Sequence, residues 1–137
     1  MPSRGTHMIV GAAAGLGATV CFPVPYENID SAWYRLGALV GGVCGAITPD
    51  IIDPPRSPGH RGIGHSVTAN TVGLSGLSFF LQDAESYFSD LIQEAQADQR
   101  HFLAALLQFI AGLLWGFVAG QVSHLALDIL TPKGLPM

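Results

Sequence analysis

The sequence predicts an all-α membrane protein: a bundle of about four transmembrane helices, with an acidic amphipathic helix between spans three and four. Of the 137 residues, 49% are hydrophobic and 12% are charged, and that charged fraction is about half the average of soluble domains. Four apolar stretches approach the ~20 residues that cross a hydrocarbon core. Glycines recur at every fourth position within them, as in helices that pack closely in lipid. We therefore treat residues 1–137 as a single membrane-embedded helical domain.

The four stretches follow one another along the chain. The first, residues 8–26, contains no charge, and the second, residues 33–52, has charges only near its ends. The third, residues 65–82, is the most polar. The fourth begins at residue 102 and continues as helical sequence to residue 130. Because that is longer than a ~30 Å core needs at ~1.5 Å per residue, one end should project from the membrane or the helix should tilt.

Two further patterns concern packing between the helices. Glycines spaced four apart predict grooves in which neighbouring helices approach closely, and they are Gly11 and Gly15, then Gly37, Gly41 and Gly45, then Gly112, Gly116 and Gly120. Residues 83–100 carry five acidic side chains, with apolar side chains at helical spacing between them. This segment predicts an acidic amphipathic helix that lies at the interface or packs on the bundle.

The basic residues indicate the orientation of the chain. With four spans, Arg35 and Arg100 fall on one side of the membrane, and the other side receives Arg4, Arg56, Arg61 and Lys133. The positive-inside rule therefore places both termini and the loop of residues 53–60 in the cytoplasm.

Histidine and aspartate side chains gather at the span ends that share this side. They are His7, Asp50, Asp53, His60, His65, His124 and Asp128. Imidazole nitrogens and carboxylate oxygens are ligands of Zn²⁺, Mn²⁺ and Fe²⁺. The pattern predicts a site for a divalent metal, with zinc as the first choice, manganese or iron as alternatives, and one or two ions.

Each of these residues also has a simpler interpretation. Asp50 and Asp53 can end a helix in a turn, and Ser66 can cap the helix that follows His65. His124 can hydrogen-bond to Asp128 across one helical turn, and His7 and His60 can be solvated. Their common side favours the metal site, because separate explanations would scatter them over both faces.

Four segments carry a resemblance to a known family. In order along the chain they are Thr6-His7, residues 49–53, residues 60–66 and residues 123–134. They resemble the predicted membrane-bound metal-dependent hydrolases named after the YdjM inner-membrane protein (domain of unknown function 457). The resemblance implies a multi-pass protein of the bacterial inner (cytoplasmic) membrane with a divalent metal, whose ligands are His7, Asp50, His60, His65, His124 and Asp128.

One position departs from the family pattern. Many members carry an acid two residues after the equivalent of Asp50, where this chain has Ile52, so the role of Asp53 stays open. The pair His124 and Asp128 is also loosely similar to the sites of zinc-dependent phospholipase C and the P1-type nucleases. That similarity implies phosphoester chemistry at the membrane surface.

These patterns predict a membrane-bound metal-dependent hydrolase acting on a lipid or another membrane-proximal ester or phosphoester at the cytoplasmic face. Asp50 or Asp53 would act as general base, and Arg61 would hold a phosphate oxygen. The alternative is a non-enzymatic scaffold whose structural metal clips the helix ends together. Metal transport is disfavoured, because transporter ligands lie near the bilayer midplane.

The expected partner is membrane lipid, and a protein partner or a homo-oligomer stays open. Nucleic acid is excluded, because the net charge is −4 and the sequence has no basic stripe.

Overall fold

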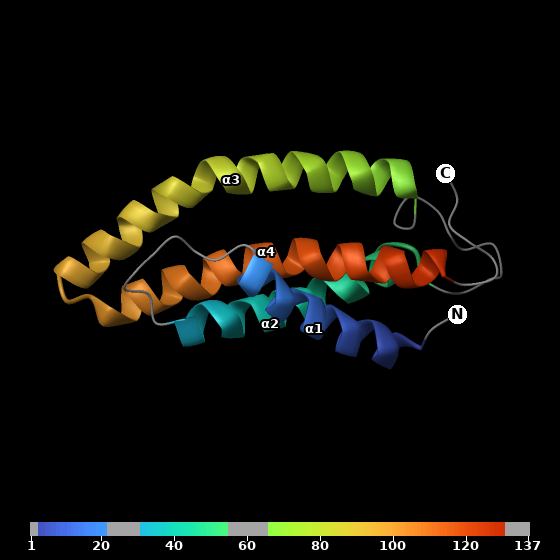
Figure 1. Cartoon of the computed structure of the whole chain (residues 1–137), viewed down its shortest axis with the longest axis horizontal. Helices are drawn as coiled ribbons and strands as arrows, with labels where there is room; N and C mark the ends of the chain where they lie inside the picture. The colour runs from blue at the N-terminus through green and yellow to red at the C-terminus, as the bar shows by residue number, and fades with distance from the viewer. Residues whose placement is uncertain (1–2, 22–30, 55–65, 131–137) are drawn as a thin grey trace.

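The structure, a computed structural model, describes residues 3–21, 31–54 and 66–130. These residues form four α-helices and no strand: α1 (Arg4–Cys21), α2 (Ser31–Ile52), α3 (Val67–Ala97) and α4 (His101–Ile129). In Figure 1, α2 and α4 run in the same direction, and α1 and α3 run the opposite way. Helices α1, α2 and α4 pack on one another, whereas α3 packs along α4. The predicted all-α class is confirmed.

The two glycine ladders form the contact between α2 and α4. A Cβ on Gly37, Gly41 or Gly45 would come within 3.0 Å of a carbonyl oxygen of α4, at Phe109, Leu113 or Phe117 in turn. A Cβ on Gly112, Gly116 or Gly120 of α4 would likewise come within 3.0 Å of a carbonyl oxygen of α2, at Tyr34, Ala38 or Gly42 in turn. The backbone of each helix therefore lies in the groove formed by the glycines of the other. Membrane helices pack closely in this way because burial of apolar surface from water cannot drive their association in lipid.

The shorter glycine pair joins α1 to α2. Gly11 and Gly15 meet the backbone of Gly42, and Gly11 also meets the side chain of Ala46. Because α1 and α2 are antiparallel, the start of α1 lies beside the end of α2. The start of α1 thus reaches the end of the bundle where α4 also finishes.

Helix α3 differs from the prediction for residues 65–100. The expected third span and the expected acidic helix form one continuous helix, Val67–Ala97. Ser66 caps its start, because its hydroxyl accepts a hydrogen bond from the amide of Ala69 at 3.3 Å. After Gly76, α3 contains no glycine or proline. Nothing in the local sequence therefore ends the helix between its polar half and its acidic half.

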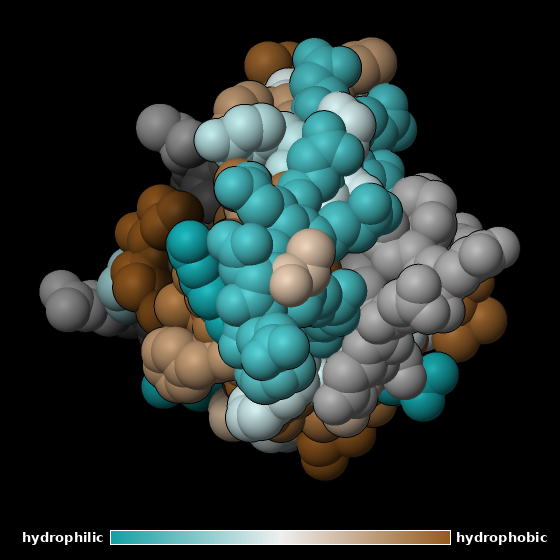
Figure 2. Space-filling view, turned by 90° about the vertical axis from the view of Figure 1, so that its left-hand side faces the viewer, coloured by the Kyte–Doolittle hydropathy of each residue, from teal (hydrophilic) through white to brown (hydrophobic). Residues whose placement is uncertain are grey.

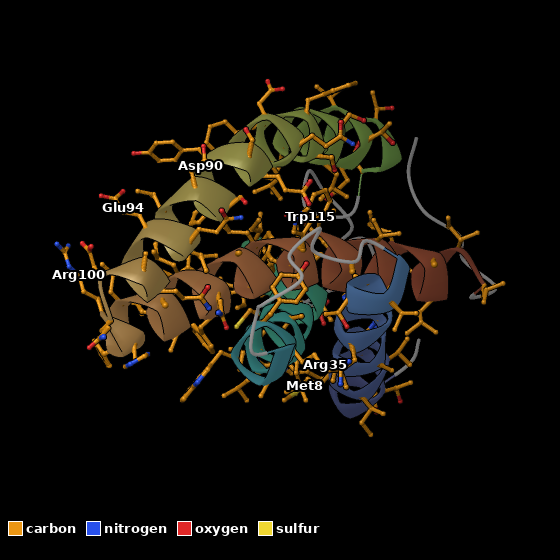
Figure 3. All side chains as sticks on the ribbon, turned by 60° about the vertical axis from the view of Figure 1, so that its left-hand side comes forward. Met8, Arg35, Asp90, Glu94, Arg100 and Trp115 are labelled. Atoms are coloured by element: carbon orange, nitrogen blue, oxygen red, sulfur yellow. The ribbon has the colours of Figure 1, made fainter. Side chains whose placement is uncertain are left out.

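The acidic half of α3 packs on the first turns of α4. Ile92 and Ala95 on α3 and Ala104 on α4 are buried in this hairpin. Figure 3 shows Asp90, Glu94 and Arg100 pointing outward at its end. Figure 2 views the molecule from this end and shows hydrophilic residues gathered over it. The hairpin therefore has an apolar interior and a polar tip.

Two of the described helices are long and apolar enough to cross a membrane, over Ala32–Ile52 and His101–Ile129. The described parts of α1 and α3 do not meet the same test of length and hydropathy. Two candidate spans are therefore established by composition, and the arrangement with four spans stays a prediction.

Candidate metal centre

His7 lies in the second turn of α1. The hydroxyl of Ser3 accepts a hydrogen bond from the amide of Thr6 at 3.2 Å, and the amide of His7 donates to the carbonyl of Ser3 at 3.1 Å. These bonds satisfy amide groups that a helix start leaves without intrahelical partners. The side chain of His7 turns into the bundle, and the residue is 3% exposed.

His124 and Asp128 continue the glycine stripe of α4. Gly112, Gly116 and Gly120 are followed at the same spacing of four by His124 and Asp128, and all five are buried. The face of α4 that meets α2 through glycine thus ends in an imidazole and a carboxylate. His124 is 0% exposed and Asp128 is 1% exposed, so both side chains lie inside the protein at the end of the helix.

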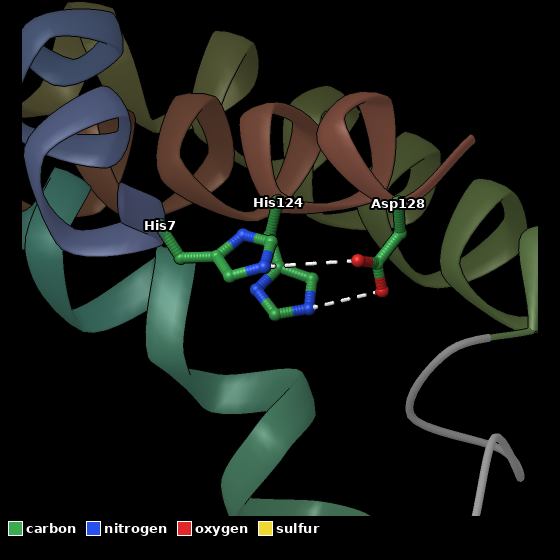
Figure 4. A group of neighbouring side chains, drawn as sticks. All are labelled: His7, His124 and Asp128. Atoms are coloured by element: carbon green, nitrogen blue, oxygen red, sulfur yellow. Dashed lines mark ion pairs between the residues drawn. The ribbon is translucent and has the colours of Figure 1, made fainter. Parts of the chain in front are cut away.

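The three side chains meet at the shared end of α1 and α4 (Figure 4). His7 Nε2 lies 3.6 Å from Asp128 Oδ1, and His124 Nε2 lies 3.5 Å from Asp128 Oδ2. The two imidazole rings stack with centroids 3.9 Å apart and planes inclined by 21°. This group of two histidines and one aspartate could hold a metal ion.

A backbone carbonyl from α2 fixes the orientation of His124. Its Nδ1 lies in hydrogen-bonding contact with the carbonyl oxygen of Ala46. A carbonyl oxygen can only accept, so Nδ1 carries the proton and the neutral ring presents a lone pair at Nε2. That is the arrangement of a metal-binding histidine, whose other nitrogen donates to a carbonyl or carboxylate.

Asp50 stands at the edge of the group, on the last turn of α2. Its Oδ1 lies 3.9 Å from His124 Nε2, and its side chain is 19% exposed. Pro49 precedes it inside the helix. Because proline has no amide hydrogen, α2 lacks one backbone hydrogen bond in the segment that supplies both the Ala46 carbonyl and the Asp50 carboxylate.

The spacing of these atoms fits a cation better than direct hydrogen bonds. Direct N–H···O bonds have donor–acceptor distances of about 2.7–3.2 Å, and the two His–Asp128 distances are 3.6 and 3.5 Å. Nitrogen and oxygen bound to one tetrahedral zinc, at ~2.0–2.2 Å each, lie about 3.3–3.5 Å apart.

The remaining predicted site residues are placed as follows. His60, Arg61 and His65 lie outside the described residues, as do Arg56 and Lys133. Asp53 is half-buried just beyond α2, where its amide donates to the carbonyl of Pro49 at 2.9 Å. It is not a member of the His7–His124–Asp128 group, and its role as ligand or base stays a prediction.

Sequence reasoning missed a pair of amide side chains beside the group. Gln121 Nε2 donates to Asn70 Oδ1 at 3.2 Å and joins α4 to α3. Asn70 also donates to the carbonyl of Ser66 at 3.0 Å. Gln121 lies one turn before His124, and this position on the site side of α4 is the signal that could have identified it.

Comparison with known proteins gives one match. The YdjM inner membrane protein family matches over residues 1–137, the whole of the chain. No curated protein and no solved structure matches the chain.

Proposed function

The chain belongs to the YdjM inner membrane protein family, and from that premise we propose that it is a membrane-bound, metal-dependent hydrolase. The proposal is carried by the buried group of His7, His124 and Asp128, with Asp50 at its edge. We propose zinc as the ion, with manganese or iron as alternatives, because imidazole and carboxylate ligands suit all three.

The four side chains differ in how exposed they are, and we assign their roles accordingly. His7, His124 and Asp128 would hold the metal, which would supply Lewis-acid chemistry and a water nucleophile at neutral pH. Asp50 is the most exposed of the four, so substrate would approach from its side. A carboxylate at that position can accept the proton of the attacking water. Asp53 and Arg61 stay candidates for a second base and for a phosphate contact.

The alternative is a structural clip without catalysis. The group joins α1 to α4, and the Ala46 carbonyl adds α2, so a bound ion would tie three helices at one end. Structural zinc sites, however, are closed by four protein ligands, whereas catalytic sites keep a position for water or substrate. Among the residues that the structure describes, three buried ligands beside a partly exposed carboxylate favour a catalytic site.

The positions of the candidate spans support a site at one face of the membrane. Gly112 of α4 packs against the backbone of Tyr34 near the start of α2, and His124 contacts Ala46 near its end. These contacts are 12 residues apart in each helix, and α2 as a whole has 22 residues, about the length that crosses a ~30 Å hydrocarbon core. Tyr34 lies near the start of α2, at the opposite end of this span, and aromatic residues are typical of a membrane boundary. We propose that the metal end faces the cytoplasm, as the basic residues of the sequence predict.

A groove between α3 and α4 supports a lipid substrate. It has a volume of about 540 Å³. Val118, Val122 and Ile129 form its wall on α4, and Ser75, Ser78 and Phe79 lie on α3. Leu74 also borders a smaller cavity of about 220 Å³ that contains the Asn70–Gln121 pair. An acyl chain in the groove would lie next to the cavity of the amide pair, at the half of α4 that carries His124 and Asp128.

A direct test uses the metal-loaded protein in vesicles of phosphatidylethanolamine and phosphatidylglycerol. Hydrolysis products are measured by mass spectrometry for the wild type, Asp50→Asn and His101→Ala. The proposal predicts product from the wild type and from His101→Ala, whose substitution lies at the exposed far end of α4. Loss with Asp50→Asn alone supports catalysis. No product from any protein, with a metal-dependent melting temperature in all three, would favour the clip.

A further inference from the structure

The two oxygens of Asp128 face two different imidazole rings. Oδ1 is 3.6 Å from His7 Nε2, and Oδ2 is 3.5 Å from His124 Nε2. Figure 4 shows these contacts side by side rather than meeting at one oxygen. Each pair has the spacing of two ligands on one ion, which is about 3.3–3.5 Å for tetrahedral zinc.

The ring geometry keeps the two imidazoles from sharing an ion without rotation. An imidazole lone pair lies in the plane of its ring, and the two planes are inclined by only 21° with centroids 3.9 Å apart. Even if the whole inclination closes toward Asp128, the planes converge by only ~1.2 Å at a metal–nitrogen bond length of ~2.1 Å. The two lone pairs therefore point to two separate positions.

We propose that the centre binds two metal ions and that Asp128 bridges them. One ion takes His7 Nε2 and Asp128 Oδ1. The other would take His124 Nε2 and Asp128 Oδ2, and Asp50 Oδ1, 3.9 Å from His124 Nε2, would lie beside this ion as the base. Because each ion would lie near the plane of its own ring, and the ring centroids are 3.9 Å apart, the two positions are distinct but only a few ångströms apart. Two-metal hydrolytic sites have separations of about 3.5–4 Å.

This inference rests on the proposed function and narrows its substrate class. A pair of ions at that distance stabilises both the attacking and the leaving oxygen of an in-line displacement, which is the chemistry of phosphoester cleavage. Phosphatases, polymerases and nucleases use such a pair, as do aminopeptidases. The proposed substrate class is a phosphoester, and the groove between α3 and α4 makes a phospholipid the first choice.

The test counts ions and measures their coupling. Chelator-stripped protein in detergent is titrated with Mn²⁺, desalted, and measured for manganese per chain by mass spectrometry. The same samples give an electron paramagnetic resonance spectrum, because carboxylate-bridged Mn²⁺ ions are exchange-coupled and isolated ions are not. The variants are His7→Ala and His124→Ala, each removing a ligand of one ion, with His101→Ala as the control. Circular dichroism checks that each variant is folded.

Two manganese ions per chain with a coupled spectrum are expected for the wild type and His101→Ala. Each ligand variant should keep one ion and lose the coupling. One ion per chain in the wild type, with an uncoupled spectrum, would overturn the bridged pair and leave a mononuclear hydrolase standing. No bound manganese or zinc in a folded wild type would overturn the metal centre itself. The wild-type spectrum decides the question even if a variant does not fold.

Discussion

The glycine ladder between α2 and α4 predicts that replacing glycine with alanine destabilises the protein at Gly41 and stabilises it at Gly73. Gly41 faces the backbone of Leu113 and Phe117, and an added Cβ would lie closer than 3.0 Å to it. Gly73 on α3 has nothing within 4 Å of the same added atom. Both glycines are inside helices, so Gly41→Ala and Gly73→Ala change intrinsic helix propensity equally.

The magnitudes follow from that difference in surroundings. Alanine in a helix interior is favoured over glycine by about 0.5–1 kcal/mol, so Gly73→Ala should stabilise the protein by about that amount. At Gly41 the overlap is with backbone, which cannot rotate away, so α2 and α4 must separate. Overpacking of this kind costs about 1–3 kcal/mol, and a gap of 0.5–1 Å forfeits about a quarter to a half of each dispersion contact. The net expectation for Gly41→Ala is a loss of about 1–2 kcal/mol.

The assay is unfolding in mixed micelles, followed by far-ultraviolet circular dichroism, with the free energy of unfolding extrapolated for each protein. The expected signs are opposite, and Gly116→Ala should behave like Gly41→Ala because it meets the backbone of Ala38. If Gly41→Ala and Gly73→Ala stabilised the protein equally, the close approach of α2 and α4 would be refuted.

The remaining predictions concern substrate, site and topology. Val122→Trp should fill the groove and reduce photo-crosslinking of a diazirine-labelled phospholipid several-fold, whereas Val72→Trp, exposed on α3 outside the groove, should not; equal labelling would remove the groove as the acyl site. Asp50→Asn should lower turnover by roughly 10²–10⁴-fold if Asp50 is the general base, and unchanged turnover would exclude that role. Ser66→Ala should cost about 1 kcal/mol through loss of the cap, measured by the same unfolding assay. In a chain without native cysteines, Ser3→Cys and Ser86→Cys should react with an impermeant maleimide from opposite sides of sealed vesicles; reaction from one side would contradict the proposed topology.

Much of the fold could be predicted because its determinants are local or periodic. The spacing of Gly37, Gly41 and Gly45 predicted a close helix contact, and these residues do meet α4. The continuous helix α3 was not predicted, because a change from polar to acidic residues resembles a boundary at the membrane surface. What keeps the helix whole is the packing of Ile92 and Ala95 on α4, a tertiary contact that composition does not reveal.

The candidate site could be predicted in part. Alternation of spans brings His7, Asp50, His124 and Asp128 to one end, and the structure brings these four together. The Ala46 carbonyl could not be foreseen, because every residue has one and only the packing of α2 on α4 selects it. The Asn70–Gln121 bond was missed for a similar reason, since it depends on how α3 lies against α4.

The most direct test of the central claim is the metal content of the protein as purified. Wild type, His7→Ala, His124→Ala and the control His101→Ala are purified in detergent without added metal or chelator and measured by inductively coupled plasma mass spectrometry. The buried His7–His124–Asp128 group predicts stoichiometric zinc, manganese or iron in the wild type and in His101→Ala. It also predicts at least a tenfold loss of metal affinity in His124→Ala, and a lower content in His7→Ala. Folded proteins that are all equally free of metal would contradict the account.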